Sequence, residues 1–114
     1  MKKDPIIFLG HILENIEYIE NFSTGLSKSG LKSNIEKQYA IVRAVEIIGE
    51  AVKNIPLSFR EKYSSVEWSK ITGTRDKLIH HYFGVDLNLL WDIVQTHLPI
   101  LKEQITQILK DNRS

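Results

Sequence analysis

Apolar residues recur every three or four positions along three stretches of this chain, which is the spacing that places them on one face of an α-helix. The pattern is clearest in the second stretch, where β-branched residues follow one another at these spacings: Ile41, Val45, Ile48, Val52 and Ile55. No stretch keeps the strict alternation of apolar and polar residues that is typical of a half-buried strand. The pattern therefore predicts an all-α protein.

Capping signals predict where the first two helices begin and end. Asp4-Pro5 predicts a helix start, with an aspartate cap and a proline at the first helical position, where its missing N–H costs nothing. The apolar stripe of this helix is Phe8, Ile12, Ile16 and Ile19. We expect the helix to end in the loop from Gly25 to Gly30. Ser33-Asn34-Ile35-Glu36 has the form of a capping box for the second helix, which Pro56 ends.

The second half of the chain predicts a short helical turn and two more helices. Pro56 opens the turn through Phe59 and Tyr63, and a second capping box, Ser64-Ser65-Val66-Glu67, precedes a helix from Trp68 to about Tyr82. Gly84 suits the exit of that helix.

Asp86 is the expected cap of the last helix. Its apolar stripe is Leu87, Leu90, Val94, Leu98, Leu101, Ile105 and Ile108. Pro99 crosses this stripe and should kink the helix, because proline removes a backbone donor. We therefore expect a bundle of about four main helices plus a short one.

Composition supports one folded domain over the whole chain, residues 1–114. The chain is 42% hydrophobic and 25% charged, as ordinary globular domains are. A domain of this size buries roughly two-thirds of the surface that its unfolded chain exposes, so pairing with a second copy would add to a modest core.

Several classes of protein are excluded by what the sequence lacks. It contains no cysteine, which removes disulfides, thiolate nucleophiles and the usual zinc sites and fits a reducing, cytoplasmic location. The apolar run from Ile6 to Leu9 is too short for a signal peptide or a membrane span. A formal net charge of +1 argues against a uniformly basic nucleic-acid binder, so any RNA contact must come from a local site.

The candidate chemistry lies between Arg75 and Tyr82. If this segment is fully helical, Asp76 and His80 sit about 40° apart around the axis, so Asp76 could orient His80. Arg75 aligns with Tyr82 but diverges from His80 by about 140°. Convergence of Arg75 and His80 then needs the arginine to bend round, a local distortion of the helix, or a second subunit.

An arginine and a histidine suit cleavage of RNA without a metal ion or cofactor. When the 2′-hydroxyl attacks the adjacent phosphorus, a histidine must move a proton and a cation must stabilise charge on the phosphoryl oxygens. Histidine titrates near neutral pH, and the arginine fork matches phosphate geometry. This spacing also occurs by chance in many helices, so by itself it is only suggestive.

The amino-acid sequence in and around this segment is more specific. Arg75, four residues, His80, one residue and Tyr82 resemble the HEPN ribonuclease motif in the form seen in HepT-like toxins. Further segments resemble sequences of this family and occur in the same order along the chain: Ile47-Ile48-Gly49-Glu50-Ala51, Trp68, Tyr82-Phe83-Gly84-Val85-Asp86 and Leu90-Trp91. The resemblance covers about residues 39–101.

This resemblance implies a homodimeric, HEPN-type antiparallel helical bundle that acts as an endoribonuclease. His80 would be the general acid or base and Arg75 would bind the scissile phosphate, with two copies of the motif in one cleft. The resemblance further implies the toxin of a type VII-like toxin–antitoxin pair. Its partner would be a small nucleotidyltransferase antitoxin that inhibits it by transferring AMP to Tyr82. RNA is the implied substrate, and no DNA or membrane is expected.

For other polar and aromatic residues a structural role is weighed against a functional one. Asp76 stands where asparagine is frequent in the family, which would weaken the local positive field. Glu50 could hold Arg75 or His80, or it could simply be a polar residue at the edge of a packed stripe. His81 is expected on the surface, Trp68 and Trp91 in the core or a dimer contact. The remaining histidines, His11 and His97, have no partner at metal-ligand spacing.

Two alternatives to a ribonuclease stay open. One is a non-catalytic module that binds a nucleotide or docks a nucleotidyltransferase through the same cleft. The other is a purely structural bundle, which would leave the exposed polar cluster without a purpose.

Overall fold

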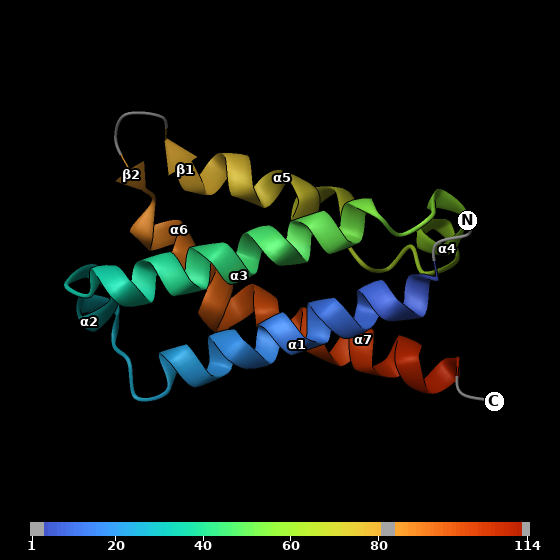
Figure 1. Cartoon of the computed structure of the whole chain (residues 1–114), viewed down its shortest axis with the longest axis horizontal. Coiled ribbons are helices and arrows are strands. Elements are labelled where there is room, and N and C mark those ends of the chain that lie inside the picture. Colours follow the sequence, from blue (N-terminus) through green and yellow to red (C-terminus); the bar gives the residue numbers. More distant parts are fainter. Residues whose placement is uncertain (1–3, 81–83, 113–114) are drawn as a thin grey trace.

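The computed structural model describes residues 4–80 and 84–112 as a bundle of helices (Figure 1). The long elements are α1 (Pro5–Ser23), α3 (Ile35–Lys53), α5 (Trp68–Leu78) and a final helix that runs through α6 (Leu87–Asp92), η1 (Ile93–His97) and α7 (Leu98–Asp111). Short helices α2 (Lys28–Lys32) and α4 (Leu57–Lys62) connect them. The prediction of an all-α bundle with four main helices is confirmed. The predicted short helix is α4. α2 was not predicted, and because it begins at Lys28 the loop expected from Gly25 to Gly30 is shorter than predicted.

The four predicted helix starts are confirmed, but the capping predicted at two of them is wrong. The Asp4 carboxylate accepts the Ile6 N–H at 2.9 Å, as expected of the first cap. At α3 the cap is Asn34, whose side chain accepts the Lys37 N–H at 3.0 Å, and not Ser33. α5 begins at Trp68 as predicted, but residues 64–66 form a turn and a bend, so the capping box predicted at residues 64–67 is wrong. Asp86 caps α6 as predicted.

The last helix changes geometry just before Pro99. Residues Ile93–His97 form a π-helical turn, and the Leu98 N–H donates to the Ile93 carbonyl. Proline lacks an N–H, and its ring clashes with the carbonyl four residues earlier, which here is that of Gln95. A widened turn at this position accommodates the proline without ending the helix. The predicted interruption therefore lies in the turn that precedes Pro99.

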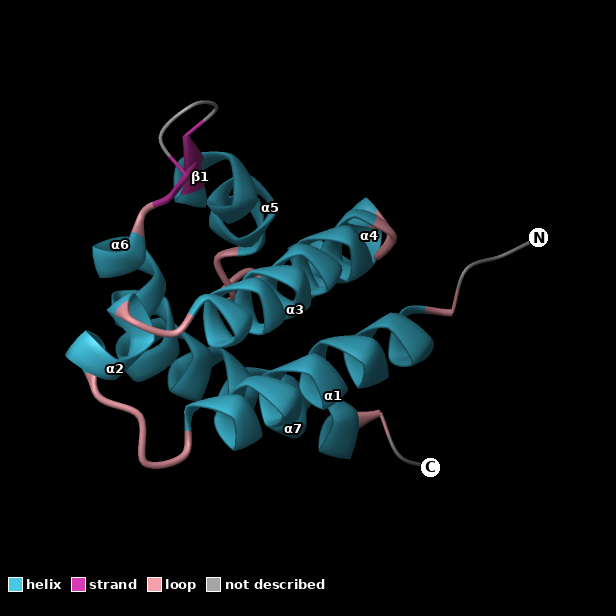
Figure 2. Ribbon diagram, turned by 60° about the vertical axis from the view of Figure 1, so that its left-hand side comes forward, coloured by secondary structure: helices cyan, strands magenta, loops and turns pink. Residues whose placement is uncertain are grey.

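The core is formed where α1 and α5 pack on either side of α3, with α7 against α1 (Figures 1 and 2). Its largest fully buried side chains are Leu9, Ile12, Ile16, Ile19, Leu31, Ile41, Ile48, Val52, Ile55, Leu78, Leu90 and Ile105. These residues include most of the predicted stripes, so the helical faces were correctly assigned.

Trp68 belongs to this core, as the sequence analysis expected. Its side chain is 6% exposed, and its indole N–H lies 3.0 Å from the carbonyl oxygens of both Arg60 and Tyr63. A buried indole needs such an acceptor. Trp68 therefore ties the start of α5 to the end of α4.

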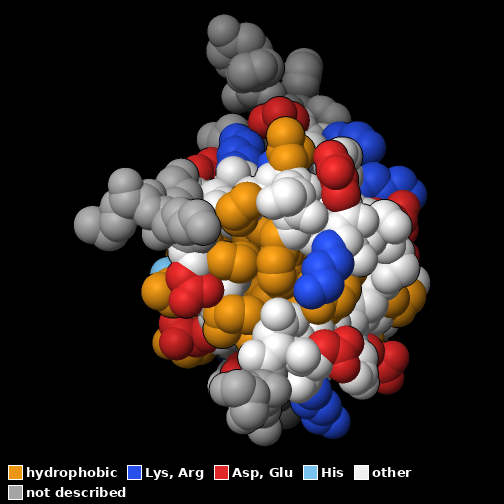
Figure 3. Space-filling view, turned by 90° about the vertical axis from the view of Figure 1, so that its right-hand side faces the viewer, with side chains coloured by type: hydrophobic (Ala, Val, Ile, Leu, Met, Phe, Trp, Pro, Cys, Tyr) orange, Lys and Arg blue, Asp and Glu red, His pale blue; other side chains and the backbone are white. Residues whose placement is uncertain are grey.

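Hydrophobic side chains also gather on the surface at one end of the bundle, where α4 and the two chain ends lie (Figures 1 and 3). Leu57, on α4 at this end, is 65% exposed. We call this the α4 end face. It lies at the opposite end of the molecule from the two strands. None of the described helices is both long and apolar enough to cross a membrane.

Candidate active site

The segment that carries the motif is not one continuous helix. α5 ends at Leu78, and the next two residues form strand β1 (Ile79–His80), which pairs antiparallel with β2 (Gly84–Val85). The predicted helix from Trp68 to about Tyr82 is therefore too long. The end of the helix has a tertiary cause: the Leu78 carbonyl accepts the Asp86 N–H at 2.7 Å, and the Leu78 side chain is fully buried.

This geometry changes how the motif residues relate to one another. The structure describes Arg75 and His80 through their backbone: Arg75 lies in the last turn of α5 and His80 in β1. The expected helical alignment of Asp76 with His80 is wrong, because the two residues belong to different elements. Asp76 is exposed on α5 and has a polar interaction of its own. Its supporting role stays a prediction.

The break after Leu78 also bears on the divergence between Arg75 and His80. A continuous helix would separate them by about 140° around its axis. The sequence left open whether the arginine bends round, the helix is distorted, or a second subunit takes part. The backbone shows a local departure from helical geometry between Arg75 and His80. The predicted modification site, Tyr82, and the neighbouring His81 lie outside the described residues.

A contact of Glu50 with the side chain of Arg75 or His80, which one interpretation of the sequence suggested, lies outside what the structure describes. Its carboxylate lies 3.5 Å from the Lys53 ammonium, one turn along α3, and both side chains are exposed. Such a surface pair contributes little to stability. The supporting role of Glu50 therefore stays a prediction.

The two described histidines outside the motif, His11 and His97, each contact a neighbouring side chain. The His97 ring nitrogen lies 3.0 Å from the Asp92 carboxylate on the same helix. His11 is exposed and meets Phe8 edge-on. Within residues 4–80 and 84–112, no group of three or more His, Asp or Glu side chains is arranged to hold a metal ion.

A groove of about 300 Å³ runs along α5, on the side that faces η1 and α7. We call it the α5 groove. Its apolar walls come from α3, α5, α6, η1 and α7: Val45, Ile48, Ile71, Leu89, Ile93, Leu98, Ile100 and Leu101. Ile100 stands at its edge with 54% of its surface exposed. The motif helix is therefore bordered by an uncovered apolar surface.

Most polar groups that line the α5 groove already have partners within the chain. The Lys70 ammonium lies 3.0 Å from the Glu67 carboxylate, and the Thr74 hydroxyl donates to the Lys70 carbonyl at 2.7 Å. The Gln104 amide donates to the Ser65 carbonyl at 3.2 Å. Because these polar groups are already paired, the surface of the groove that remains for a ligand is mainly apolar. Such a surface suits protein side chains better than a polar ligand.

Sequence reasoning missed the two strands, although a weak signal was present. Ile79 and Val85, which pair with each other across the two strands, are both β-branched, and such residues favour strands. Each strand has only two residues, so no periodic pattern could develop.

Comparison with known proteins identifies the family of the chain. The family described as "Ribonuclease HepT-like" matches residues 12–108, which include the whole segment from Arg75 to Tyr82. No solved structure gives a significant match.

Several curated relatives align with nearly the whole chain. "Putative RNase TTE0752" of Caldanaerobacter subterraneus is 42% identical over 97% of this chain and 99% of its own length. "Probable ribonuclease HepT" of Thermococcus cleftensis is 40% identical over 96% of this chain and its own full length. "Gamma-glutamylcyclotransferase and putative RNase MJ0434" of Methanocaldococcus jannaschii is 45% identical over 97% of this chain. The chain spans half the length of that last relative.

Proposed function

The chain belongs to the HepT-like ribonuclease family, and we propose that it is a cytoplasmic toxin that cuts RNA with Arg75 and His80. The observation that carries this proposal is the family match over residues 12–108, a range that contains Arg75, His80 and Tyr82. The end of α5 and strand β1 then supply the two elements on which the catalytic residues stand.

In the proposed reaction the 2′-hydroxyl of one nucleotide attacks the adjacent phosphorus. The oxygen–phosphorus bond to the next nucleotide breaks, which leaves a cyclic phosphate on one fragment and a 5′-hydroxyl on the other. His80 takes the proton from the attacking hydroxyl or gives one to the leaving oxygen. Arg75 stabilises the charge on the phosphoryl oxygens through its paired N–H groups.

The direct test is cleavage of labelled RNA by the purified wild-type protein and by His80→Ala and Arg75→Ala. Both variants are expected to lose cleavage, and expression of His80→Ala should no longer be toxic. His11→Ala is the matched control, since His11 is an exposed histidine on α1 outside the motif. Equal cleavage or equal toxicity of wild type and His80→Ala would contradict the proposal. Binding of a nucleotide or a nucleotidyltransferase without any cleavage would favour the non-catalytic module instead.

We further propose that two copies pair through the α5 groove. An exposed side chain lies beside an apolar groove there: Ile100 is exposed at the edge of the groove, and the groove itself is lined by apolar residues. A two-fold axis lets each copy place its Ile100 against the groove of the other, which is the reciprocal contact of an isologous interface. Charges of both signs, Glu67 and Lys70, line the groove, so two identical surfaces need not repel.

Such pairing would bring the two α5 helices and their motifs near each other in one cleft. It would also cover apolar surface that a chain of 114 residues leaves open. The dimer and the catalytic site are thus linked through the same helix.

The proposed partner is a nucleotidyltransferase antitoxin that transfers AMP to Tyr82. An AMP group two residues from His80 would add bulk and negative charge where the RNA phosphate must sit. RNA would then be excluded by occlusion and by repulsion.

A further inference from the structure

We propose that Gly84 and Asp86 are positioning residues that fix the place of His80 by closing and anchoring the two-stranded hairpin. This inference rests on the proposed role of His80 in cleavage. It differs from the helical interpretation of the motif, in which a neighbour on the same helix face would orient the histidine.

Gly84 is the residue directly opposite His80 in the hairpin. Its φ of +79° lies in the region that residues with a Cβ rarely adopt. Among the described residues the only other positive φ is that of Gly25, at +71°, in the loop after α1. The strand partner of His80 thus needs a glycine for its backbone conformation.

Asp86 anchors the base of the hairpin in two ways. Its N–H donates to the Leu78 carbonyl at 2.7 Å, directly below the pair of Ile79 with Val85. Its carboxylate accepts the Leu89 N–H at 3.0 Å and so caps α6. One residue therefore connects the end of α5, the hairpin and the start of α6.

Anchoring is needed because a hairpin of two residues per strand is not stable on its own. Leu78, fully buried, holds one end of the hairpin to the core, and Asp86 with its cap holds the other. A shift of about 1 Å in a catalytic group can cost about a hundredfold in rate. The backbone of Gly84 and Asp86 is thus expected to control kcat without touching RNA.

The main test compares Gly84→Ala with Gly25→Ala. An added Cβ meets no atom within 4 Å at either glycine, so both substitutions impose the same kind of backbone strain and no clash. We expect Gly84→Ala to lower kcat at least about tenfold with KM changed less than about twofold, because positioning acts on the chemical step. Gly25→Ala should leave both constants near wild type. Equal kcat for the two variants would overturn the role of Gly84.

Rescue by residue type sharpens this test. Asparagine tolerates positive φ better than alanine does, so Gly84→Asn should recover much of the kcat that Gly84→Ala loses. A purely structural defect would instead lower the melting temperature of Gly84→Ala and Gly25→Ala alike without separating their kcat values. If Gly84→Asn is as slow as Gly84→Ala, the backbone conformation of Gly84 is not what positions His80.

Asp86 is tested through its cap. Asp86→Ala removes the acceptor for Leu89, whereas Asp86→Asn keeps a side-chain oxygen that can cap α6. We expect Asp86→Ala to lower kcat, and Asp86→Asn, which keeps the cap, to lower it less. Asn34→Ala, which removes the cap of α3, is the matched control and should leave kcat unchanged. Loss of kcat in Asp86→Asn equal to that in Asp86→Ala would overturn the anchoring role of the cap.

Hydrogen exchange separates this inference from the proposed function. The Asp86 amide should be protected in the wild type and exchange faster in Gly84→Ala, whether or not the protein cuts RNA. A wild type with a protected Asp86 amide but no cleavage would refute only the ribonuclease proposal. An unprotected Asp86 amide in an active wild type would refute the hairpin anchor.

Discussion

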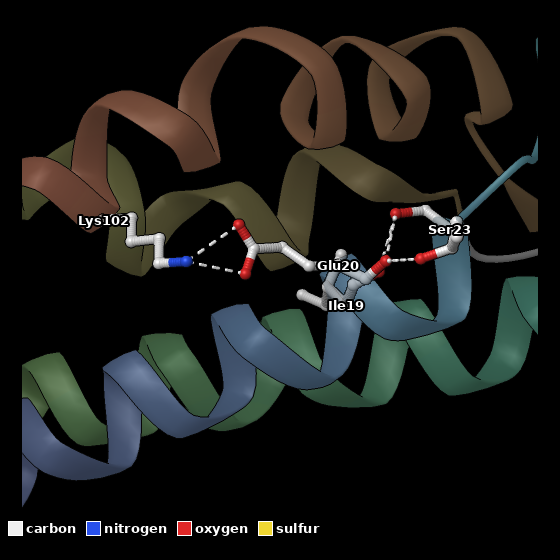
Figure 4. A network of polar contacts seen from close by, with 5 residues as sticks. Ile19, Glu20, Ser23 and Lys102 are labelled. Carbon is white, nitrogen blue, oxygen red and sulfur yellow. Dashed lines mark hydrogen bonds and ion pairs between the residues drawn. The ribbon is translucent and has the colours of Figure 1, made fainter.

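The Lys102 ammonium lies 2.8 Å from one carboxylate oxygen of Glu20 and 3.1 Å from the other, and so joins α7 to α1 (Figure 4). The two residues are 82 positions apart in the chain. The hydrogen bond to Glu20, together with the charges of Glu20 and Glu17, raises the pKa of Lys102 above its ordinary value of 10.5.

Glu20→Gln should lower the melting temperature slightly, and the difference from wild type should depend on pH. A lysine whose pKa is raised by folding stabilises the protein at pH values below its unfolded pKa, and this contribution is lost as pH rises through the folded pKa. The difference is thus expected to be constant near neutral pH, to begin to fall near pH 10.5, and to vanish only above the raised pKa of Lys102. It should also shrink with added salt, because both side chains are partly exposed.

Glu17→Gln is the control for this pair, since Glu17 acts on Lys102 through its charge alone. Its effect on the melting temperature should be smaller. A Glu20→Gln effect that stays the same across the alkaline range would contradict the ion pair.

Asn34→Ala should destabilise the protein by about 1 kcal/mol, the usual cost of losing a helix cap. Its side chain accepts the Lys37 N–H at the start of α3, whereas the Ser33 hydroxyl donates to the Gly30 carbonyl at 3.2 Å. Ser33→Ala should therefore change the free energy of unfolding by less than about 0.5 kcal/mol. Urea unfolding of both variants measures the difference, and a larger loss for Ser33→Ala would restore the capping box predicted from the sequence.

Ile100→Glu should convert the proposed dimer into a monomer, because a charge would be buried in the α5 groove. The matched variant is Leu57→Glu on the α4 end face, where a hydrophobic residue is exposed to 65% against 54% for Ile100. Sedimentation of both variants identifies the interface. Dissociation by Leu57→Glu but not by Ile100→Glu would move the dimer contact to the other end of the bundle.

Tyr82→Phe should keep RNA cleavage largely intact yet escape inhibition by the antitoxin, because it removes the hydroxyl that would accept AMP. Mass measurement of the wild type after co-expression with the antitoxin should show the gain of one or more AMP groups, and the variant should show none. Full neutralisation of Tyr82→Phe would mean that the antitoxin acts by docking alone.

The apolar stripes alone were enough to predict the first, second and last long helices and their buried faces. Ile41, Ile48 and Val52 recur at helical spacing, and burying them needs only a partner of any kind, so the pattern does not depend on the details of the fold. The motif likewise identified the candidate residues, because Arg75, His80 and Tyr82 form a spacing that can be read directly from the chain.

What surrounds those residues was decided by contacts between distant parts of the chain. Nothing local to Leu78 ends α5: its carbonyl accepts the N–H of Asp86, and its side chain enters the core. Local propensity is a weak influence that such tertiary contacts override. For the same reason the sequence could predict that His80 belongs to the site, but only the tertiary structure placed it on a strand opposite Gly84.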